Sequence, residues 1–135
     1  MNAKERVAAA IARKSVDRVP LGFYAVDHDI IEQVIGRPTL IRNKVEAQIA
    51  LWEGRRDDLL QSYMHDSVDF YRKLDCVDLI LFKEAPLLPP RGYEPDPPRK
   101  IGEDLWKTRD GRILQADRHA NDLMCINEVE VEEKV

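Results

Sequence analysis

The residues of this chain that could take part in chemistry come directly after two short apolar runs. His28 follows the first run, which lies within residues 17–25, and Lys83 follows the second, residues 79–82. A histidine can exchange a proton near neutral pH, and a lysine ammonium can bind an anionic oxygen. Because ligands gather at the carboxyl ends of parallel strands, both side chains are predicted to lie at the mouth of a pocket. The alternative is that both are solvated surface side chains.

Four further side chains are of types that bind zinc: His65, Cys76, His119 and Cys125. Zinc needs three or four ligands held close together, and local pairs at short spacing usually supply them. None of the four is paired in this way, so we expect no metal site. The two cysteines are interpreted as small buried hydrophobic residues.

Two arginines, Arg55 and Arg56, stand just before the expected start of a helix at Asp57. Arginine side chains and the free N–H groups of a helix start can together bind an anion. The alternative is a solvated junction between two helices. The chain contains no glycine-rich phosphate loop, Cys-x-x-Cys pair, Gly-x-Ser-x-Gly elbow or His-Glu-x-x-His motif.

The spacing of apolar residues predicts the elements that would position these side chains. Helical periodicity, with capping residues at the starts and glycine or proline at the stops, predicts helices over residues 2–14, 28–35, 43–53 and 57–73. Asn2 and Glu5 form an asparagine version of the capping box at the start of the first helix.

The two apolar runs are predicted to be strands that are buried on both faces, because each is short, continuous and bounded by turn residues. Gly22, within the first run, would let a neighbouring backbone or ligand come close. Residues 1–84 therefore have the order helix, strand, three helices, strand. This order predicts an α/β unit with parallel strands.

The chain changes character after residue 84. Residues 85–100 contain six of the eight prolines, which predicts an extended surface loop. Asp110-Gly111 between β-prone residues predicts a β-hairpin, and residues 123–126 are predicted to form a further strand. Residues 101–135 are thus interpreted as a hairpin followed by a C-terminal strand.

Composition excludes several classes of function. The net charge is −4, with 21 basic and 25 acidic residues, so no basic face for nucleic acid is expected. No apolar run approaches the roughly 20 residues of a membrane span. Charged residues interrupt the N-terminus where a signal peptide would be apolar, and two isolated cysteines suit a reducing compartment. We therefore expect a cytoplasmic protein.

Three groups of motifs occur in a set order along nearly the whole chain. They are Met1-Asn2-Ala3-Lys4-Glu5-Arg6-Val7 with Asp17-Arg18-Val19-Pro20; Leu51-Trp52-Glu53-Gly54-Arg55-Arg56-Asp57-Asp58 with Tyr71-Arg72-Lys73-Leu74-Asp75; and Trp106-Lys107-Thr108 with Asp110-Gly111-Arg112. Their order and spacing resemble uroporphyrinogen decarboxylase-like proteins, and most closely the branch of corrinoid-dependent methyltransferases. The resemblance implies that the fold is the N-terminal portion of a TIM (β/α)8 barrel.

The resemblance also implies methyl transfer to or from a corrinoid. Zinc-binding members take their histidine and cysteine ligands from later barrel strands, which have no counterpart here. Corrinoid and zinc are therefore implied for the complete enzyme, and neither is expected to bind this chain alone. The resemblance implies that some residues line the substrate pocket, shaping it and making polar contacts, while no catalytic residue is assigned. These pocket residues are Phe23, Tyr24, His28, Phe82 and Lys83.

A complete barrel takes about 250 residues, so residues 1–135 would form a single incomplete domain. Such a chain is expected to form a homo-oligomer or to pair with a second chain that completes the barrel, and a corrinoid protein is a further expected partner. The rival function is a non-catalytic, truncated relative that acts as an oligomerising or partner-binding module. Uroporphyrinogen decarboxylase proper ranks third, because residues 26–32 replace that enzyme's Met-Arg-Gln-Ala-Gly-Arg segment.

Overall fold

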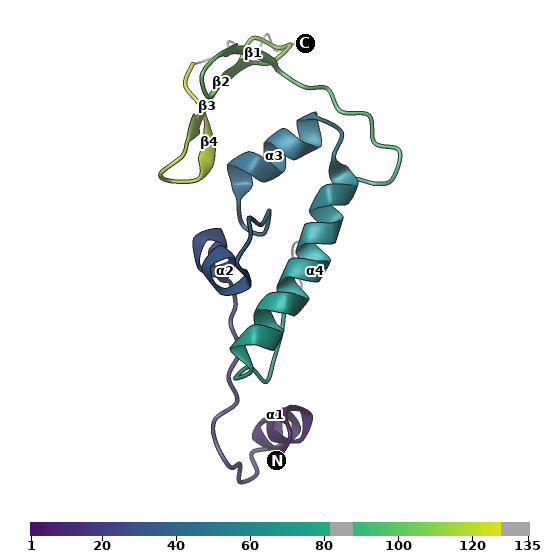
Figure 1. The fold of residues 1–135 in the computed structure, drawn as a ribbon, viewed down its shortest axis with the longest axis vertical. Helices are drawn as coiled ribbons and strands as arrows, with labels where there is room; N and C mark the ends of the chain where they lie inside the picture. Colours follow the sequence, from purple (N-terminus) through teal and green to yellow (C-terminus); the bar gives the residue numbers. More distant parts are fainter. Residues whose placement is uncertain (82–87, 128–135) are drawn as a thin grey trace, which may run out of the picture.

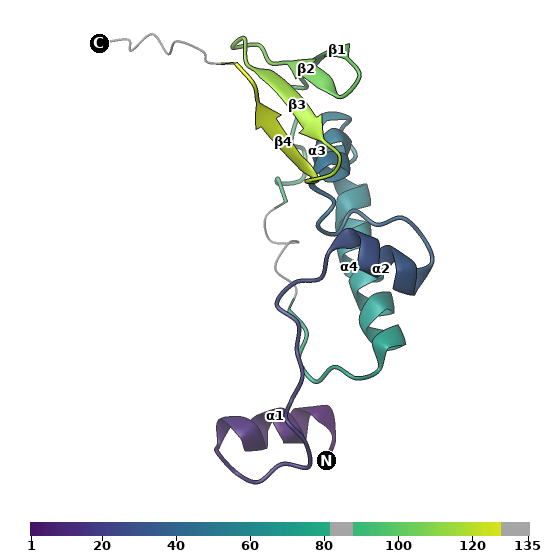
Figure 2. The ribbon, with the colours of Figure 1, turned by 90° about the vertical axis from the view of Figure 1, so that its left-hand side faces the viewer.

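A computed structural model describes residues 1–81 and 88–127. The molecule is elongated, with a short N-terminal helix at one end, three helices in the middle and a small sheet at the other end (Figure 1). One extended segment, within residues 12–27, connects the N-terminal helix to the rest of the chain, and the segment that follows the long helix of the middle part runs beside it (Figure 2). The helices are α1 (Ala3–Ile11), α2 (His28–Ile35), α3 (Lys44–Trp52) and α4 (Arg56–Leu74).

The predicted capping residues are found at the start of α1 and at the end of α2. The Asn2 side chain accepts from the N–H of Glu5 at 2.9 Å, and the Glu5 carboxylate accepts from the N–H of Asn2 at 3.0 Å. The predicted capping box of α1 is therefore confirmed. Gly36 ends α2 with a φ of 77°, a left-handed conformation that glycine adopts without a steric penalty.

Helices α2 and α4 and the loop after α2 share an apolar core. Four buried side chains form its centre: Ile31, Ile35, Ile41 and Phe70. The loop between α2 and α3 is held on α4 by Asp66, whose carboxylate accepts from the Thr39 hydroxyl at 2.8 Å and from Arg37 Nη2 at 2.7 Å. The loop thus follows α4 and brings the start of α3 towards the sheet.

The sheet is antiparallel, with four strands in chain order: β1 (Arg99–Gly102), β2 (Leu105–Lys107), β3 (Ile113–Asp117) and β4 (Asp122–Cys125). Lys107 pairs with Ile113 across the predicted Asp110-Gly111 turn, so this hairpin is confirmed. The predicted further strand corresponds to β4. Strand β1 begins inside the stretch that was predicted as a proline-rich loop.

A second core joins the sheet to α3. Val45, Trp106 and Ala116 are buried there, and Trp52 packs against them. The ring centroids of Trp52 and Trp106 lie 5.5 Å apart at a tilt of 53°, an arrangement that aromatic pairs favour. The sheet is therefore docked on the helices by apolar contact.

The predicted fold class, the N-terminal portion of a TIM barrel, is wrong. The only sheet in the described residues is the antiparallel one, whereas a barrel portion would need a parallel sheet. The two apolar runs that were predicted as buried parallel strands meet at a single parallel bridge, between Gly22 and Leu79. In the described part of both runs there is no strand ladder, and most of the apolar side chains there are exposed. The described residues form instead a small mixed domain of four helices and an antiparallel sheet.

Among the described residues, no helix is both long enough and apolar enough to cross a membrane.

Candidate functional site

The contact between the two apolar runs is short but close. The carbonyl oxygen of Leu21 accepts hydrogen bonds from the N–H groups of Asp78, at 2.8 Å, and Leu79, at 3.2 Å. A Cβ atom added to Gly22 would lie 3.2 Å from both the Cβ and the carbonyl oxygen of Leu79. Gly22 therefore permits the close backbone approach that its position in the sequence predicts.

A cluster of charged side chains holds this contact against α1. Arg6 donates to Asp17 at 2.6 Å and to Asp78 at 2.5 Å, and Arg18 donates to Asp78 at 2.6 Å. The N–H of Leu21 also donates to Asp78, at 2.9 Å. The Asp78 side chain is 1% exposed and that of Arg6 is 9% exposed. Two carboxylates, two guanidinium groups and the N-terminal ammonium of Met1, 3.5 Å from Asp17, therefore form one connected network.

The cluster stabilises the charged form of both carboxylates. The N–H of Leu21, followed by Arg18 and Arg6, lowers the pKa of Asp78. The Arg6 guanidinium beside Asp17 holds the pKa of that carboxyl well below its usual range. Each of the two carboxylates and two guanidinium groups is paired with others of the cluster. This pairing indicates a structural role, and no group of the cluster remains to act as a general acid or base.

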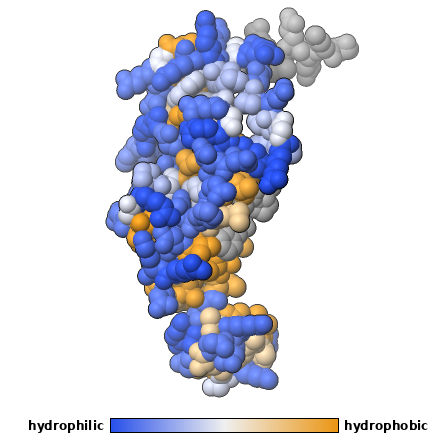
Figure 3. Space-filling view, turned by 45° about the vertical axis from the view of Figure 1, so that its right-hand side comes forward, coloured by the Kyte–Doolittle hydropathy of each residue, from blue (hydrophilic) through white to orange (hydrophobic). Residues whose placement is uncertain are grey.

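Apolar side chains surround the same contact and are open to solvent. We call this surface the apolar edge, and it consists of Val19, Leu21, Leu79, Ile80 and Leu81, which are 81%, 40%, 59%, 42% and 47% exposed. Figure 3 shows apolar side chains gathered at the lower end of the main body, next to the narrow connection to α1. Exposed apolar residues that occur singly are normal, but a contiguous group is a mark of an interaction surface.

Of the predicted pocket residues, the three that the structure describes, Phe23, Tyr24 and His28, share no cavity. Tyr24 lies with Leu81 and Tyr71 at a cavity of about 20 Å³, which is close to the space of one water molecule. His28 lines a different cavity, and Phe23 lines none of the cavities described here. Phe82 and Lys83 lie outside the described residues. The structure therefore provides no substrate-sized pocket shared by Tyr24 and His28.

The cavity at His28 is polar and has a volume of about 320 Å³. It lies between the starts of α2 and α3 and the β3–β4 turn. Its lining includes one ion pair, in which Arg42 donates to Asp27 at 2.9 Å. Lys44 also lines the cavity, and its ammonium donates at 3.1 Å to Asp122, which lies outside the lining. Asp27 thus binds Arg42 and makes no side-chain capping bond to α2, although it stands at the predicted capping position.

Asn121, in the β3–β4 turn, connects the three parts of this cavity. Its side-chain oxygen accepts from the N–H of Val45 at 3.3 Å, and its side-chain nitrogen donates to the carbonyl of Arg42 at 2.8 Å. The same nitrogen lies 3.2 Å from Nδ1 of His28. Asn121 therefore caps α3, a role that the sequence suggests for Asn43, whose side chain makes no such bond. The sequence does not predict that Asn121 caps α3, because its partners Val45 and Arg42 lie far from it along the chain.

No metal centre is formed by the described residues, among which no three His, Cys, Asp or Glu side chains are grouped to hold an ion. The interpretation of Cys76 and Cys125 as buried residues is wrong, since both are exposed. The apolar residues near each cysteine do not cover it. Cys76 lies next to the exposed run 79–81, and Cys125 is the last residue of the outer strand β4.

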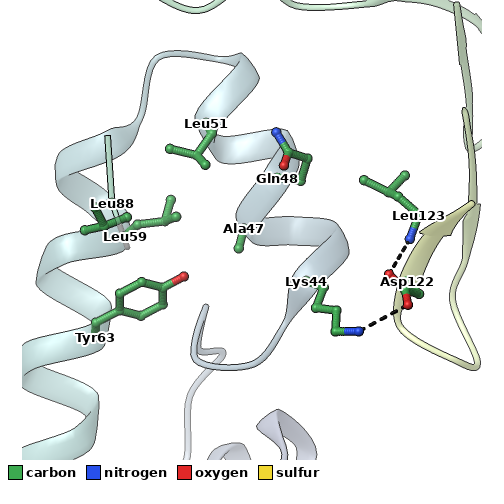
Figure 4. A pocket seen from close by; sticks show the side chains of 9 residues that line it. All are labelled: Lys44, Ala47, Gln48, Leu51, Leu59, Tyr63, Leu88, Asp122 and Leu123. Atoms are coloured by element: carbon green, nitrogen blue, oxygen red, sulfur yellow. Dashed lines mark hydrogen bonds and ion pairs between the residues drawn. The ribbon is translucent and has the colours of Figure 1, made fainter. Parts of the chain in front are cut away.

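Two larger cavities lie elsewhere in the described residues. One, of about 380 Å³, lies between α3, α4 and β4, with leucines and Tyr63 along one side and the Lys44–Asp122 pair at its end (Figure 4). The other, of about 430 Å³, contains the predicted anion-binding arginines. Arg55 is paired with Glu53 at 2.7 Å and Arg56 with Asp57 at 2.8 Å. These pairs favour the alternative interpretation, a solvated helix junction.

No family model matches this chain, and no curated protein or solved structure is significantly similar to it.

Proposed function

We propose that this chain is a non-catalytic module that associates with a second copy of itself through the apolar edge. The observation that supports this proposal is the group of five exposed apolar side chains around the Gly22–Leu79 bridge. Covering apolar surface is favourable by about 25 cal/mol per Å². A partner that covers the edge would therefore stabilise the chain as it binds.

The electrostatics of the edge favour a second copy as the partner. Each chain carries a net charge of −4, so two copies repel one another at long range. At the edge, however, Arg6 and Arg18 neutralise Asp17 and Asp78 within the cluster. Two copies can approach there without bringing like charges together. A two-fold axis would place the same apolar patch on both sides of the interface, as in most homodimers.

The proposal is tested by sedimentation equilibrium of the wild-type chain and two matched variants. Leu81→Lys places a charge in the apolar edge, and Met124→Lys places one on β4, outside the edge. The two wild-type side chains are equally exposed, at 47%. We expect the wild type and Met124→Lys to dimerise as concentration rises and Leu81→Lys to stay monomeric. A monomeric wild type, or equal association of both variants, contradicts the proposal.

The second candidate is a segment of a uroporphyrinogen decarboxylase-like methyltransferase that acts with a chain supplying the zinc ligands. The sequence resemblance supports it, together with the position of Tyr24 and Leu81 beside the same small cavity. In this case a corrinoid, or a corrinoid protein, should co-purify with the chain from its native source. Visible absorbance of the purified complex would detect it, and a colourless preparation without partner chains argues against this candidate. Uroporphyrinogen decarboxylase proper remains the third candidate.

The predicted cytoplasmic location belongs to this proposal as well. The two exposed cysteines are free thiols, and free thiols persist in reducing compartments.

A further inference from the structure

We propose that His28 and Asn121 form a pH-sensitive latch between the β3–β4 turn and the helices. The latch is closed while His28 is neutral and opens when His28 takes up a proton. This inference is independent of association through the apolar edge, which uses other residues.

The first step is the orientation of the Asn121 amide. Its oxygen faces the N–H of Val45, a donor, at 3.3 Å, and its nitrogen faces the carbonyl of Arg42, an acceptor, at 2.8 Å. Turning the amide by 180° would set the NH2 group against an N–H and the oxygen against a carbonyl. Both hydrogen bonds would then be lost, so only one orientation satisfies the neighbours.

The second step is the state of the His28 ring. In this orientation the second hydrogen of the Asn121 NH2 group points to Nδ1 of His28, 3.2 Å away. Nδ1 must therefore accept, which requires a neutral ring with its proton on Nε2. A proton added to Nδ1 converts the acceptor into a donor and places two N–H groups against each other. The contact between His28 and Asn121 is then broken.

Charged groups of both signs line the cavity with His28: carboxylates from the start of α2, and cations from the loop before α3 and from the start of α3. Asp27 already binds Arg42, so neither group is free to compensate for a proton on His28. The titratable and charged groups that line the cavity with His28 are Asp27, Asp29, Arg42, Lys44 and His119.

The latch lies at the edge of the interface between the sheet and the helices. Asn121 caps α3 through Val45, and Val45 belongs to the core that contains Trp106. Loss of the His28 contact leaves the Asn121 side chain with two hydrogen bonds in place of three, while the Lys44–Asp122 and Arg118–Glu46 ion pairs still join the sheet to α3. Docking of the sheet should weaken, and the Trp52–Trp106 pair within the same interface reports it. These are the only tryptophans of the chain.

The direct test is the tautomer of His28, measured on the full chain by ¹⁵N NMR of the histidine rings between about pH 5 and pH 8. We expect a neutral ring with the proton on Nε2 at the upper end of this range. A ring with the proton on Nδ1 overturns the proposal, and this measurement needs no variant.

The second test follows urea unfolding by tryptophan fluorescence as the pH is lowered across the same range. The unfolding midpoint of the wild type should fall more than that of His28→Gln, which cannot take up the proton. His119→Gln is the matched control, because His119 lines the same cavity without contacting Asn121, and it should behave as the wild type. Equal falls in the wild type and His28→Gln overturn the proposal.

A third variant, Asn121→Asp, tests whether the fall of the unfolding midpoint at low pH comes from the Asn121 NH2 group that faces His28. Asn121→Asp keeps a residue that tolerates the left-handed φ of 51° at this position. It replaces the NH2 donor with a carboxylate oxygen, which binds protonated His28. The midpoint of Asn121→Asp should therefore fall less than that of the wild type as the pH drops. A larger fall contradicts the latch.

Discussion

At the scale of single residues, Gly22 determines how closely the two apolar runs approach. Alanine at this position would place a Cβ 3.2 Å from both Cβ and the carbonyl oxygen of Leu79. That distance is tighter than most Cβ contacts, and one of the two atoms is a backbone oxygen that cannot rotate away. Leu79 would have to shift, so Gly22→Ala should lower the free energy of unfolding by about 1–3 kcal/mol. Gly102→Ala is the matched control, since its Cβ would meet a leucine methyl at 3.4 Å. If urea unfolding gives the two variants equal stability, the backbones at Gly22 and Leu79 are not packed tightly enough to require glycine.

Local capping could be predicted from the sequence at this scale, and long-range capping could not. Asn2 and Glu5 lie three residues apart, so their spacing alone predicted their hydrogen bonds. Asn43 and Asp27 stand at the right positions, but their capping bonds are absent. Asn121 caps α3 from 76 residues away along the chain. Spacing along the sequence carries no information about such a partner.

At the scale of elements, docking of the sheet on α3 depends on Trp106. It is 6% exposed and packs on Trp52 and Val45. Trp106→Ala leaves a cavity in this core and should cost about 3–5 kcal/mol of stability. Chemical denaturation followed by circular dichroism measures the loss, with Met124→Ala on the exposed part of β4 as the control. A loss below about 1 kcal/mol would show that the sheet docks by other contacts.

Helices and the hairpin could be predicted because their signals are local: helical spacing, a glycine stop and an Asp-Gly turn. The two predicted parallel strands failed for a physical reason. A strand exists only as part of a ladder, and the apolar runs meet at one bridge, between Gly22 and Leu79. Apolar composition cannot distinguish a run that is buried in a sheet from one that lies exposed at a surface.

At the scale of the whole molecule, the charge cluster ties α1 to the main body and should make stability depend on pH. The pKa of Asp17 and that of Asp78 are both lowered in the folded chain. Their contribution is present above the unfolded-state pKa of about 3.9 and is lost as the pH falls through the folded-state values. We expect the wild type to lose stability below about pH 4 more steeply than Asp17→Asn.

Thermal unfolding between about pH 2 and pH 6 measures this slope. Asp57→Asn is the control, since the Asp57 side chain is 77% exposed and lies outside the cluster. If Asp17→Asn and Asp57→Asn have the same acid dependence, the cluster does not hold α1 in place.

The central claim is that the apolar edge becomes covered when two copies associate. Amide hydrogen exchange at a series of protein concentrations tests it most directly, because it locates the protected residues. Protection should increase with concentration in peptides that cover residues 19–22 and 79–81, and should stay constant in those that cover β1 to β4. Protection that is independent of concentration, or that increases on the sheet and not at the edge, would contradict the claim.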